Sequence, residues 1–387
     1  MSNSIEAVAP ARNFAIDHLR AAMICVVMFG HALLPYVTVP RRFKDPATHA
    51  SFDVVALFLY TFAMPLFFVT AGYAVAALFT RRGARGVFQN RLRTIFFPLL
   101  IAYFLLTPLT RASYQFAATV STSGSLQMGI DVLLAGDWIR WSKAYHLWFL
   151  VSLLLYTAMA IGLRYGAISI AAGLSQRIAE SSRALFQPIT GPILLILIAA
   201  ATLVPAYSLY DGDATTLPMQ LHLFSFFIVG WFLHTHRDRL DDMAARPGAY
   251  VLIALLSLPV AAWSMRLRWF APEQTDWFTG AIAGVSSAGV VVGMSFGLLG
   301  YFHRRFSEQP SPVGQYLSEA SYWIFLIHLP LLIFVGGALS ATALPATMKY
   351  LLTVAIVVPA VMATYHFGVR NSVLGRLLKG RPKETKN

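Results

Sequence analysis

Charged residues are scarce in this sequence. Asp, Glu, Lys and Arg together make up 12% of its 387 residues, about half the share that is usual in soluble domains. A soluble chain of this length covers its core with charged side chains, and here there are too few to form such a surface. Hydrophobic residues reach 57% and the mean hydropathy is +0.62. The composition excludes an ordinary soluble globule, a disordered chain and a coiled coil, and it predicts a protein that crosses a membrane many times.

Several catalytic signatures are also missing. The single cysteine, Cys25, excludes an intrachain disulfide and any zinc or iron–sulfur cluster built on cysteines. No pair of His or carboxylate residues has a metal-binding spacing such as H-E-x-x-H, so we predict no metal site. There is no G-x-S-x-G elbow, phosphate-binding loop or dinucleotide fingerprint. A serine hydrolase, an ATPase and a nucleotide-dependent redox enzyme therefore all lack support.

Long apolar runs are what the sequence does contain. A membrane span needs about 20 mostly apolar residues, and ten segments fit: Ala15–Val39, Phe52–Phe79, Thr94–Thr110, His146–Leu163, Ile189–Tyr207, Pro218–His234, Tyr250–Met265, Phe278–Phe302, Ser321–Leu339 and Lys349–Phe367. We expect an all-α integral membrane protein, a bundle of about ten transmembrane helices that forms a single domain over residues 1–387. Its helical core would span about 14–368, with short tails at 1–13 and 369–387. The apolar run Tyr165–Leu174 is only ten residues long, so it should extend the fourth span or lie at the interface.

The balance of charge is strongly basic, with 30 Lys and Arg against 17 acidic residues. In a soluble protein this excess would suggest nucleic acid as a partner. In a membrane protein, Lys and Arg gather in cytoplasmic loops and fix the topology. With ten spans, the side that holds both termini carries 20 of the 30 basic residues and the other side carries 9. We therefore expect both termini in the cytoplasm, the lipid bilayer as the surroundings, and no nucleic-acid partner.

Three ionisable residues stand on one face of the first apolar run. Asp17 and Arg20 are three residues apart, and His31 follows Arg20 by eleven, which places it within about 20° of Arg20 around a helix. The rise per residue separates Arg20 from His31 by about 16 Å along the axis. Ionisable groups within the membrane are costly and face the bundle interior. One interpretation makes His31 a proton acceptor reached from outside, while Arg20 meets an anion from inside. The other is a packed histidine and an interfacial Asp17–Arg20 ion pair.

A second cluster of candidates is the arginine-rich connection that precedes the third span. It contains Arg85, Arg91 and Arg93 and no acidic residue between positions 81 and 93. Guanidinium groups bind phosphate in a bidentate manner, which favours a phosphate cradle. Anchoring by the positive-inside rule is the other interpretation, and both stay open.

Polar and aromatic side chains of two spans form a third group. His146 and Trp148 begin the fourth span at the outer interface, and Tyr322 and His328 lie in the ninth span. They are candidates either for an interfacial aromatic belt or for the lining of a substrate entrance. We expect five further histidines at the membrane interface: His222, His234, His236, His303 and His366.

The order of these motifs resembles the membrane acyltransferase-3 family. The resemblance rests on the following runs: Asp17-His18-Leu19-Arg20 with His31 eleven residues later, Met64-Pro65-Leu66-Phe67-Phe68-Val69-Thr70-Ala71-Gly72-Tyr73, Arg91-Leu92-Arg93 ahead of Pro98, His146-Leu147-Trp148-Phe149-Leu150, and Ala320-Ser321-Tyr322-Trp323-Ile324-Phe325-Leu326-Ile327-His328. The spacing is most similar to the branch that succinylates osmoregulated periplasmic glucans.

The resemblance implies a ten-helix enzyme of the bacterial inner membrane. Such an enzyme takes an acyl group from cytoplasmic acyl-CoA, a donor substrate and not a resident cofactor, and delivers it to a periplasmic glucan. His31 would be the catalytic histidine, with Arg20 and Asp17 beside it. Arg91 and Arg93 would form the second arginine site, although the family usually spaces this pair three residues apart and here they are two apart.

Other functions stay open at this point. Succinyl is the favoured acyl group, and acetyl transfer to another surface or lipid-linked glycan is an alternative. A non-enzymatic glycan transporter or flippase would share the same composition and the same intramembrane polar groups.

Overall fold

The protein is described by a computed structural model that covers residues 14–141, 143–170, 172–210, 216–309, 311–373 and 375. These ranges contain helices and turns and no strand. The helices are α1 (Phe14–Leu33), α2 (Ala50–Arg91), α3 (Phe97–Ser123), α4 (Leu126–Leu134), α5 (Trp148–Ile170), α6 (Ala172–Ser182), α7 (Thr190–Tyr210), α8 (Leu217–Thr235), α9 (Leu240–Ala244), α10 (Pro247–Phe270), α11 (Trp277–Phe306), α12 (Pro312–Ser340) and α13 (Ala346–Ala363). Two π-helical turns, Leu92–Phe96 and Thr364–Val369, and five short 3-10 turns join or extend them.

Nine helical runs in the described residues are long and apolar enough to cross a membrane. The second run, Ala50–Ser123, has 74 residues. At 1.5 Å per residue its length far exceeds the roughly 30 Å of a hydrocarbon layer. It contains two of the ten predicted spans, and each of the others overlaps one of the remaining runs. The all-helical prediction is confirmed. The predicted tail 1–13 and most of the tail 369–387 lie outside the described residues.

The long run bends at Gly83, within α2. Gly83 has φ 62° and ψ −176°, a combination that only glycine adopts readily because it has no Cβ. The bend separates the apolar start of α2 from the arginine-rich segment at its end. That segment leads through the π-turn Leu92–Phe96 into α3, so Arg91 is carried back toward the bundle.

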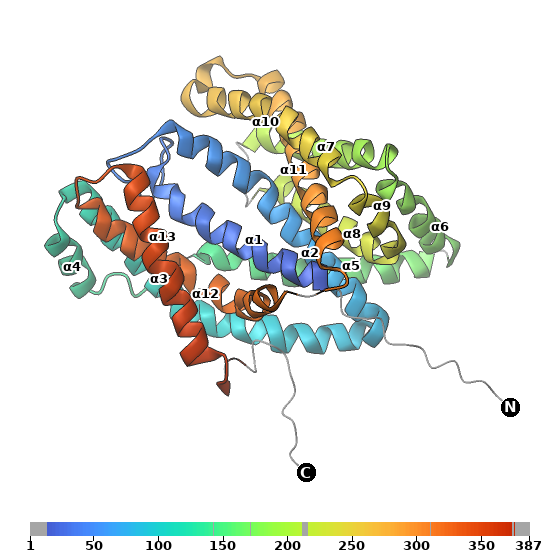
Figure 1. Ribbon diagram of the computed structural model, residues 1–387, viewed down its shortest axis with the longest axis horizontal. Coiled ribbons are helices and arrows are strands. Elements are labelled where there is room, and N and C mark those ends of the chain that lie inside the picture. Colours follow the sequence, from blue (N-terminus) through green and yellow to red (C-terminus); the bar gives the residue numbers. More distant parts are fainter. Residues whose placement is uncertain are drawn as a thin grey trace, which may run out of the picture.

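Helices α1, α2, α5 and α12 surround the centre of the molecule (Figure 1). Helix α1 packs against α12 and α2, while α12 also packs against α3 and α13. On the other side, α11 packs between α7 and α10 (Figure 1). Helix α5 continues to Ile170, so the first part of the short apolar run Tyr165–Leu174 extends the fourth predicted span.

Glycines bring α2 and α8 into close contact. A Cβ on Gly72 would lie 1.9 Å from the carbonyl oxygen of Phe227, and one on Gly230 would lie 2.0 Å from the oxygen of Val69. Small residues allow this approach, which stabilises membrane helix pairs by van der Waals packing. The crossing fixes the part of α2 that carries Phe67 and Phe68.

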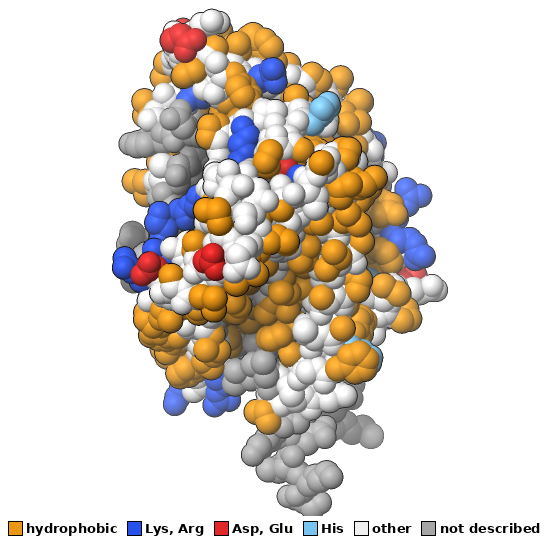
Figure 2. Space-filling model, turned by 90° about the vertical axis from the view of Figure 1, so that its left-hand side faces the viewer, with side chains coloured by type: hydrophobic (Ala, Val, Ile, Leu, Met, Phe, Trp, Pro, Cys, Tyr) orange, Lys and Arg blue, Asp and Glu red, His pale blue; other side chains and the backbone are white. Residues whose placement is uncertain are grey.

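The outer surface is strongly apolar. Hydrophobic side chains cover much of the face shown in Figure 2. Large apolar residues on several helices are exposed, including Leu105, Leu197, Leu256 and Phe278. A soluble protein rarely exposes such an extensive apolar surface, so this surface fits contact with lipid.

Candidate active site

Helix α1 presents one continuous stripe to two cavities. Asp17, Arg20 and Ile24 line the first cavity, and Val27 and His31 line the second. These positions follow the spacing of three and four residues that marks one helix face. The prediction that Asp17, Arg20 and His31 share a face is therefore confirmed. The structure places Arg20 and His31 in different cavities along that face.

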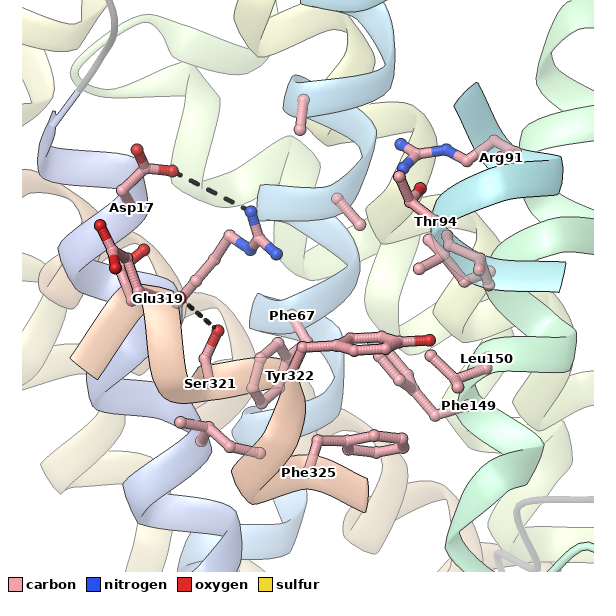
Figure 3. A pocket seen from close by; sticks show the side chains of 17 residues that line it. Asp17, Phe67, Arg91, Thr94, Phe149, Leu150, Glu319, Ser321, Tyr322 and Phe325 are labelled. Carbon is pink, nitrogen blue, oxygen red and sulfur yellow. Dashed lines mark hydrogen bonds and ion pairs between the residues drawn. The ribbon is translucent and has the colours of Figure 1, made fainter. Parts of the chain in front are cut away.

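The first space, here called the arginine cavity, has a volume of about 400 Å³ and is lined by Asp17, Arg20, Arg91, Glu319, Tyr322 and their neighbours. Figure 3 shows Asp17 and Glu319 on one side, Arg91 and Thr94 on the other, and Tyr322 pointing across the space toward Phe149 and Leu150.

Two arginines face this cavity together with the carboxylates of Asp17 and Glu319. The Arg20 guanidinium lies 4.0 Å from the Asp17 carboxylate, and the Arg20 side chain is 45% exposed. The Nε atom of Arg91 is buried and has no hydrogen-bond partner in the described residues. Arg20 and Arg91 line the same cavity. Two like charges that face one space attract an anion, which relieves their repulsion.

The other predicted donor-binding arginines lie elsewhere. Arg85 and Arg93 are exposed, and neither lines the arginine cavity. Residues two apart on a helix point about 200° away from each other, so Arg91 and Arg93 cannot both face the same cavity. The structure therefore favours Arg91 as the arginine that meets a ligand there. A donor-binding role of Arg85 and Arg93 stays a prediction.

The second space, here called the histidine cavity, has a volume of about 590 Å³ and is lined by His31, Arg41, Tyr60, His146, Trp148, His222, Trp269 and apolar side chains. His222 is buried at 1% exposure and accepts or donates a hydrogen bond at 3.0 Å with Thr202. His222 is thus buried in the protein interior, and its predicted position at the membrane interface stays a prediction.

Hydrogen bonds fix the orientation of His31. Its Nδ1 lies 3.0 Å from the carbonyl oxygen of Val27, which can only accept, so we assign the proton to Nδ1. The lone pair then remains on Nε2, the nitrogen available to take a proton. The edge of the His31 ring also meets Tyr60, with ring centroids 5.8 Å apart.

His328 supports His31 from the protein side. Its Nδ1 lies 2.9 Å from the carbonyl oxygens of Ile324 and Phe325, and its Nε2 lies 3.3 Å from His31 Nδ1. With its own proton on Nδ1, His328 presents an acceptor to His31 and would stabilise the positive charge that His31 gains on protonation. His328 is fully buried and lines neither cavity, so the structure places it behind His31.

The predicted substrate-binding residues divide between the cavities. His146 and Trp148 line the histidine cavity, whereas Tyr322 lines the arginine cavity. His146 is held by a hydrogen bond of 3.0 Å from its Nε2 to the carbonyl oxygen of Leu326, and its ring meets His328 edge to face at 5.5 Å. No group of three or more His, Cys, Asp or Glu residues within the described ranges has metal-binding geometry.

Two phenylalanines mark the boundary between the cavities. Phe149 from α5 and Phe325 from α12 line both, and their ring centroids are 5.6 Å apart. Phe67 packs against Phe149 at 5.6 Å. Each of these aromatic residues lies inside a run that carries the family resemblance, but the sequence analysis assigned none of them a role. They separate the space that holds two arginines from the space that holds a potential base.

Comparison with known proteins agrees with this arrangement. A family model described as an acyltransferase domain matches residues 13–366. The chain belongs to the membrane acyltransferase-3 family. Similar proteins include glucans biosynthesis protein C of Salmonella schwarzengrund, 24% identical over 98% of this chain and 97% of the relative. The protein of that name from Salmonella typhi is 23% identical with the same coverage. No solved structure matches the chain.

The family and the fold together establish the general class. The chain is a multi-pass membrane acyltransferase, which confirms the resemblance drawn from the order of its motifs. An acyltransferase needs a donor site, an acceptor site and a group that takes the proton from the acceptor. The structure provides two adjoining cavities, and His31 is one of three histidines, with His146 and His222, that line the second.

Proposed function

We propose that this protein transfers an acyl group, with succinyl favoured, from cytoplasmic acyl-CoA to a hydroxyl of a periplasmic glucan. The proposal also places both termini in the cytoplasm and the protein in the bacterial inner membrane. Its main support is the pair of cavities that meet at Phe149 and Phe325. The relatives named for glucan biosynthesis favour a glucan as acceptor.

The arginine cavity suits the donor. CoA carries phosphates, and Arg20 and Arg91 offer guanidinium groups to them. The cavity follows α1 from Arg20 past Ile24, and the distance along α1 from Arg20 to His31 is about 16 Å. A pantetheine arm has to cover a distance of this order to carry the thioester from the phosphate site to the boundary at Phe149 and Phe325.

The histidine cavity suits the acceptor. It contains Trp148 and Trp269, whose ring faces can stack on sugars. A glucan hydroxyl that enters here would donate its proton to Nε2 of His31 as its oxygen attacks the thioester carbon. The carbon–sulfur bond then breaks, the acyl ester remains on the sugar, and the CoA sulfur takes the proton that His31 had accepted. General-base assistance of this kind contributes about 10²–10⁴ in rate, and the alignment of two bound substrates adds to it.

A transfer assay with the purified full-length protein tests the proposal. The protein is incubated with a neutral β-glucan and either labelled succinyl-CoA or labelled acetyl-CoA, and free thiol and labelled glucan are measured. We expect one free thiol per ester formed, with succinyl-CoA the better donor. His31→Ala should reduce transfer by at least about 10²-fold while the protein still inserts in the membrane. Full activity of a well-folded His31→Ala protein would contradict the assignment of the base, and no transfer from either donor would contradict the function.

A further inference from the structure

The histidine cavity has an unusual balance of charge. Among the described residues, its lining contains one arginine, Arg41, and no aspartate or glutamate. Arg41 is exposed, so it lies where the cavity opens. Tyr60 lines the same cavity, and its ring contacts His31. Arg41, Tyr60 and His31 thus follow one another along the wall of the cavity.

Arg41 belongs to the connection between α1 and α2, residues 34–49, and the nearest carboxylates along the chain are engaged elsewhere. Asp45 is buried and pairs with Lys349 of α13, with Nζ–Oδ1 at 2.8 Å. Asp53, at the start of α2, accepts hydrogen bonds from the backbone and the hydroxyl of Thr38. No ion pair joins Arg41 to a carboxylate within the described residues. Its guanidinium is therefore free for an anion that enters the cavity.

The same contacts hold the connection in place. The backbone nitrogen of Asp45 donates to the carbonyl oxygen of Pro35 at 2.8 Å, and that of His49 donates to Tyr36 at 3.1 Å. The buried Asp45–Lys349 pair ties the connection to α13. An anchored connection favours binding by the planar guanidinium group of Arg41, because less conformational freedom is lost when a ligand binds.

We propose that Arg41 binds the free carboxylate of a dicarboxylic acyl group and so selects a succinyl-type donor over a neutral acetyl donor. This inference rests on the proposed function. A thioester that approaches from the arginine cavity carries its acyl group at its leading end. Once the thioester carbon reaches His31, the remainder of the acyl group extends into the histidine cavity. Among the lining residues that the structure describes, Arg41 is the only one with a formal charge there, and a guanidinium pairs with a carboxylate through two parallel hydrogen bonds.

The neighbouring arginine offers a matched control. Arg42 lies in the same connection and is also exposed, but its guanidinium lies over the rings of Tyr114 and Tyr145, at 6.0 and 5.6 Å, and it does not line the histidine cavity. Arg42→Gln removes the same charge from the same segment. Arg41→Lys keeps the charge at the proposed site but removes the planar fork.

The test compares kcat/KM for succinyl-CoA and acetyl-CoA at a saturating concentration of one neutral glucan. Arg41→Gln should lower kcat/KM about 10- to 100-fold for succinyl-CoA, the range expected for loss of a charged hydrogen bond. It should leave kcat/KM for acetyl-CoA within about twofold of the value for the unmodified protein. Arg41→Lys should recover part of the lost kcat/KM for succinyl-CoA. Arg42→Gln should leave the ratio of kcat/KM for the two donors unchanged.

Three results would overturn this assignment. Arg41→Gln could lower transfer from both donors by the same factor, Arg42→Gln could shift the donor ratio as far as Arg41→Gln does, or the unmodified protein could use acetyl-CoA and not succinyl-CoA. If the unmodified protein transfers from neither donor, the proposed function itself fails and the assignment of Arg41 fails with it.

Discussion

At the scale of single residues, the site depends on how one histidine is held. His31 keeps its free nitrogen in the cavity because Nδ1 is engaged by Val27. His328 approaches the same Nδ1 from 297 positions away in the sequence. The sequence could place His31 on a face with Arg20, since that relation is local to one helix. It could not show His328 behind His31, since that contact depends on how α1 and α12 pack.

His328 is a positioning residue that acts through His31. His328→Ala should lower kcat about tenfold, because His31 loses a hydrogen-bond acceptor and the packing that orients its ring. The KM for acyl-CoA should change little, since His328 lines neither cavity. His328→Gln keeps an acceptor oxygen near the position of Nε2 and should recover part of kcat. A rise in KM with kcat unchanged in His328→Ala would contradict this role.

Arg91 should carry more of the donor affinity than its neighbours. Arg91→Gln is expected to raise the KM for acyl-CoA about tenfold, because a charged contact with a phosphate is lost. Arg82 is an exposed arginine of α2 outside the arginine cavity, so Arg82→Gln provides the matched control and should leave the KM close to that of the unmodified protein. Steady-state kinetics at varied acyl-CoA concentration measure both KM values. Equal increases in KM for Arg91→Gln and Arg82→Gln would contradict a specific role of Arg91.

At the scale of helices, close packing positions the residues that line the cavities. The α2–α8 crossing leaves no room for a side chain at Gly230. We expect Gly230→Ala to cost about 1–3 kcal/mol of stability, since its Cβ would overlap the Val69 carbonyl and the helices would have to separate.

Gly162 of α5 provides a matched test of that expectation. A Cβ at Gly162 would meet no atom within 4 Å, so Gly162→Ala introduces the same methyl group without overlap. Thermal unfolding in detergent should show a lower Tm for Gly230→Ala and no loss for Gly162→Ala. Equal Tm values for the two variants would show that the crossing tolerates a larger separation.

Helices were also the elements that the sequence predicted best. Apolar length alone located the spans, because every backbone polar group in a membrane has to be paired within its own helix. The environment of Lys349 could not be predicted in this way. The sequence analysis placed it at the start of the tenth span and predicted no partner for it, but it is 1% exposed and pairs with Asp45. A buried ion pair requires two segments to meet, and hydrophobic periodicity within one segment does not report that.

At the scale of the whole molecule, the two cavities and the aromatic boundary between them form one path. On α1 and α12, the residues that line the arginine cavity come earlier in the sequence than those that line or support the histidine cavity. On α5 the residues that line the histidine cavity come first. The sequence indicated a donor end and an acceptor end on α1. It did not indicate the boundary, because Phe149 and Phe325 look like ordinary apolar residues until the helices are packed together.

Loss of this aromatic boundary should allow hydrolysis of the donor thioester without transfer to a glucan. Phe149→Ala would open the arginine cavity toward the histidine cavity, and water that enters could attack the thioester in place of a sugar hydroxyl. We expect release of free CoA thiol in the absence of glucan to rise relative to the unmodified protein. Phe88→Ala changes an exposed ring on α2 outside both cavities and serves as the control. Unchanged thiol release in Phe149→Ala would contradict a role for Phe149 in separating donor and acceptor.

The most direct test of the account is a transfer assay across a sealed membrane. The full-length protein is reconstituted in vesicles that enclose neutral β-glucan, labelled succinyl-CoA is supplied outside only, and the enclosed glucan is then isolated and its label counted. We expect labelled glucan inside the vesicles and at least about 10²-fold less of it with His31→Ala. Labelled glucan that forms only when donor and acceptor share one compartment would contradict transfer of the acyl group across the membrane.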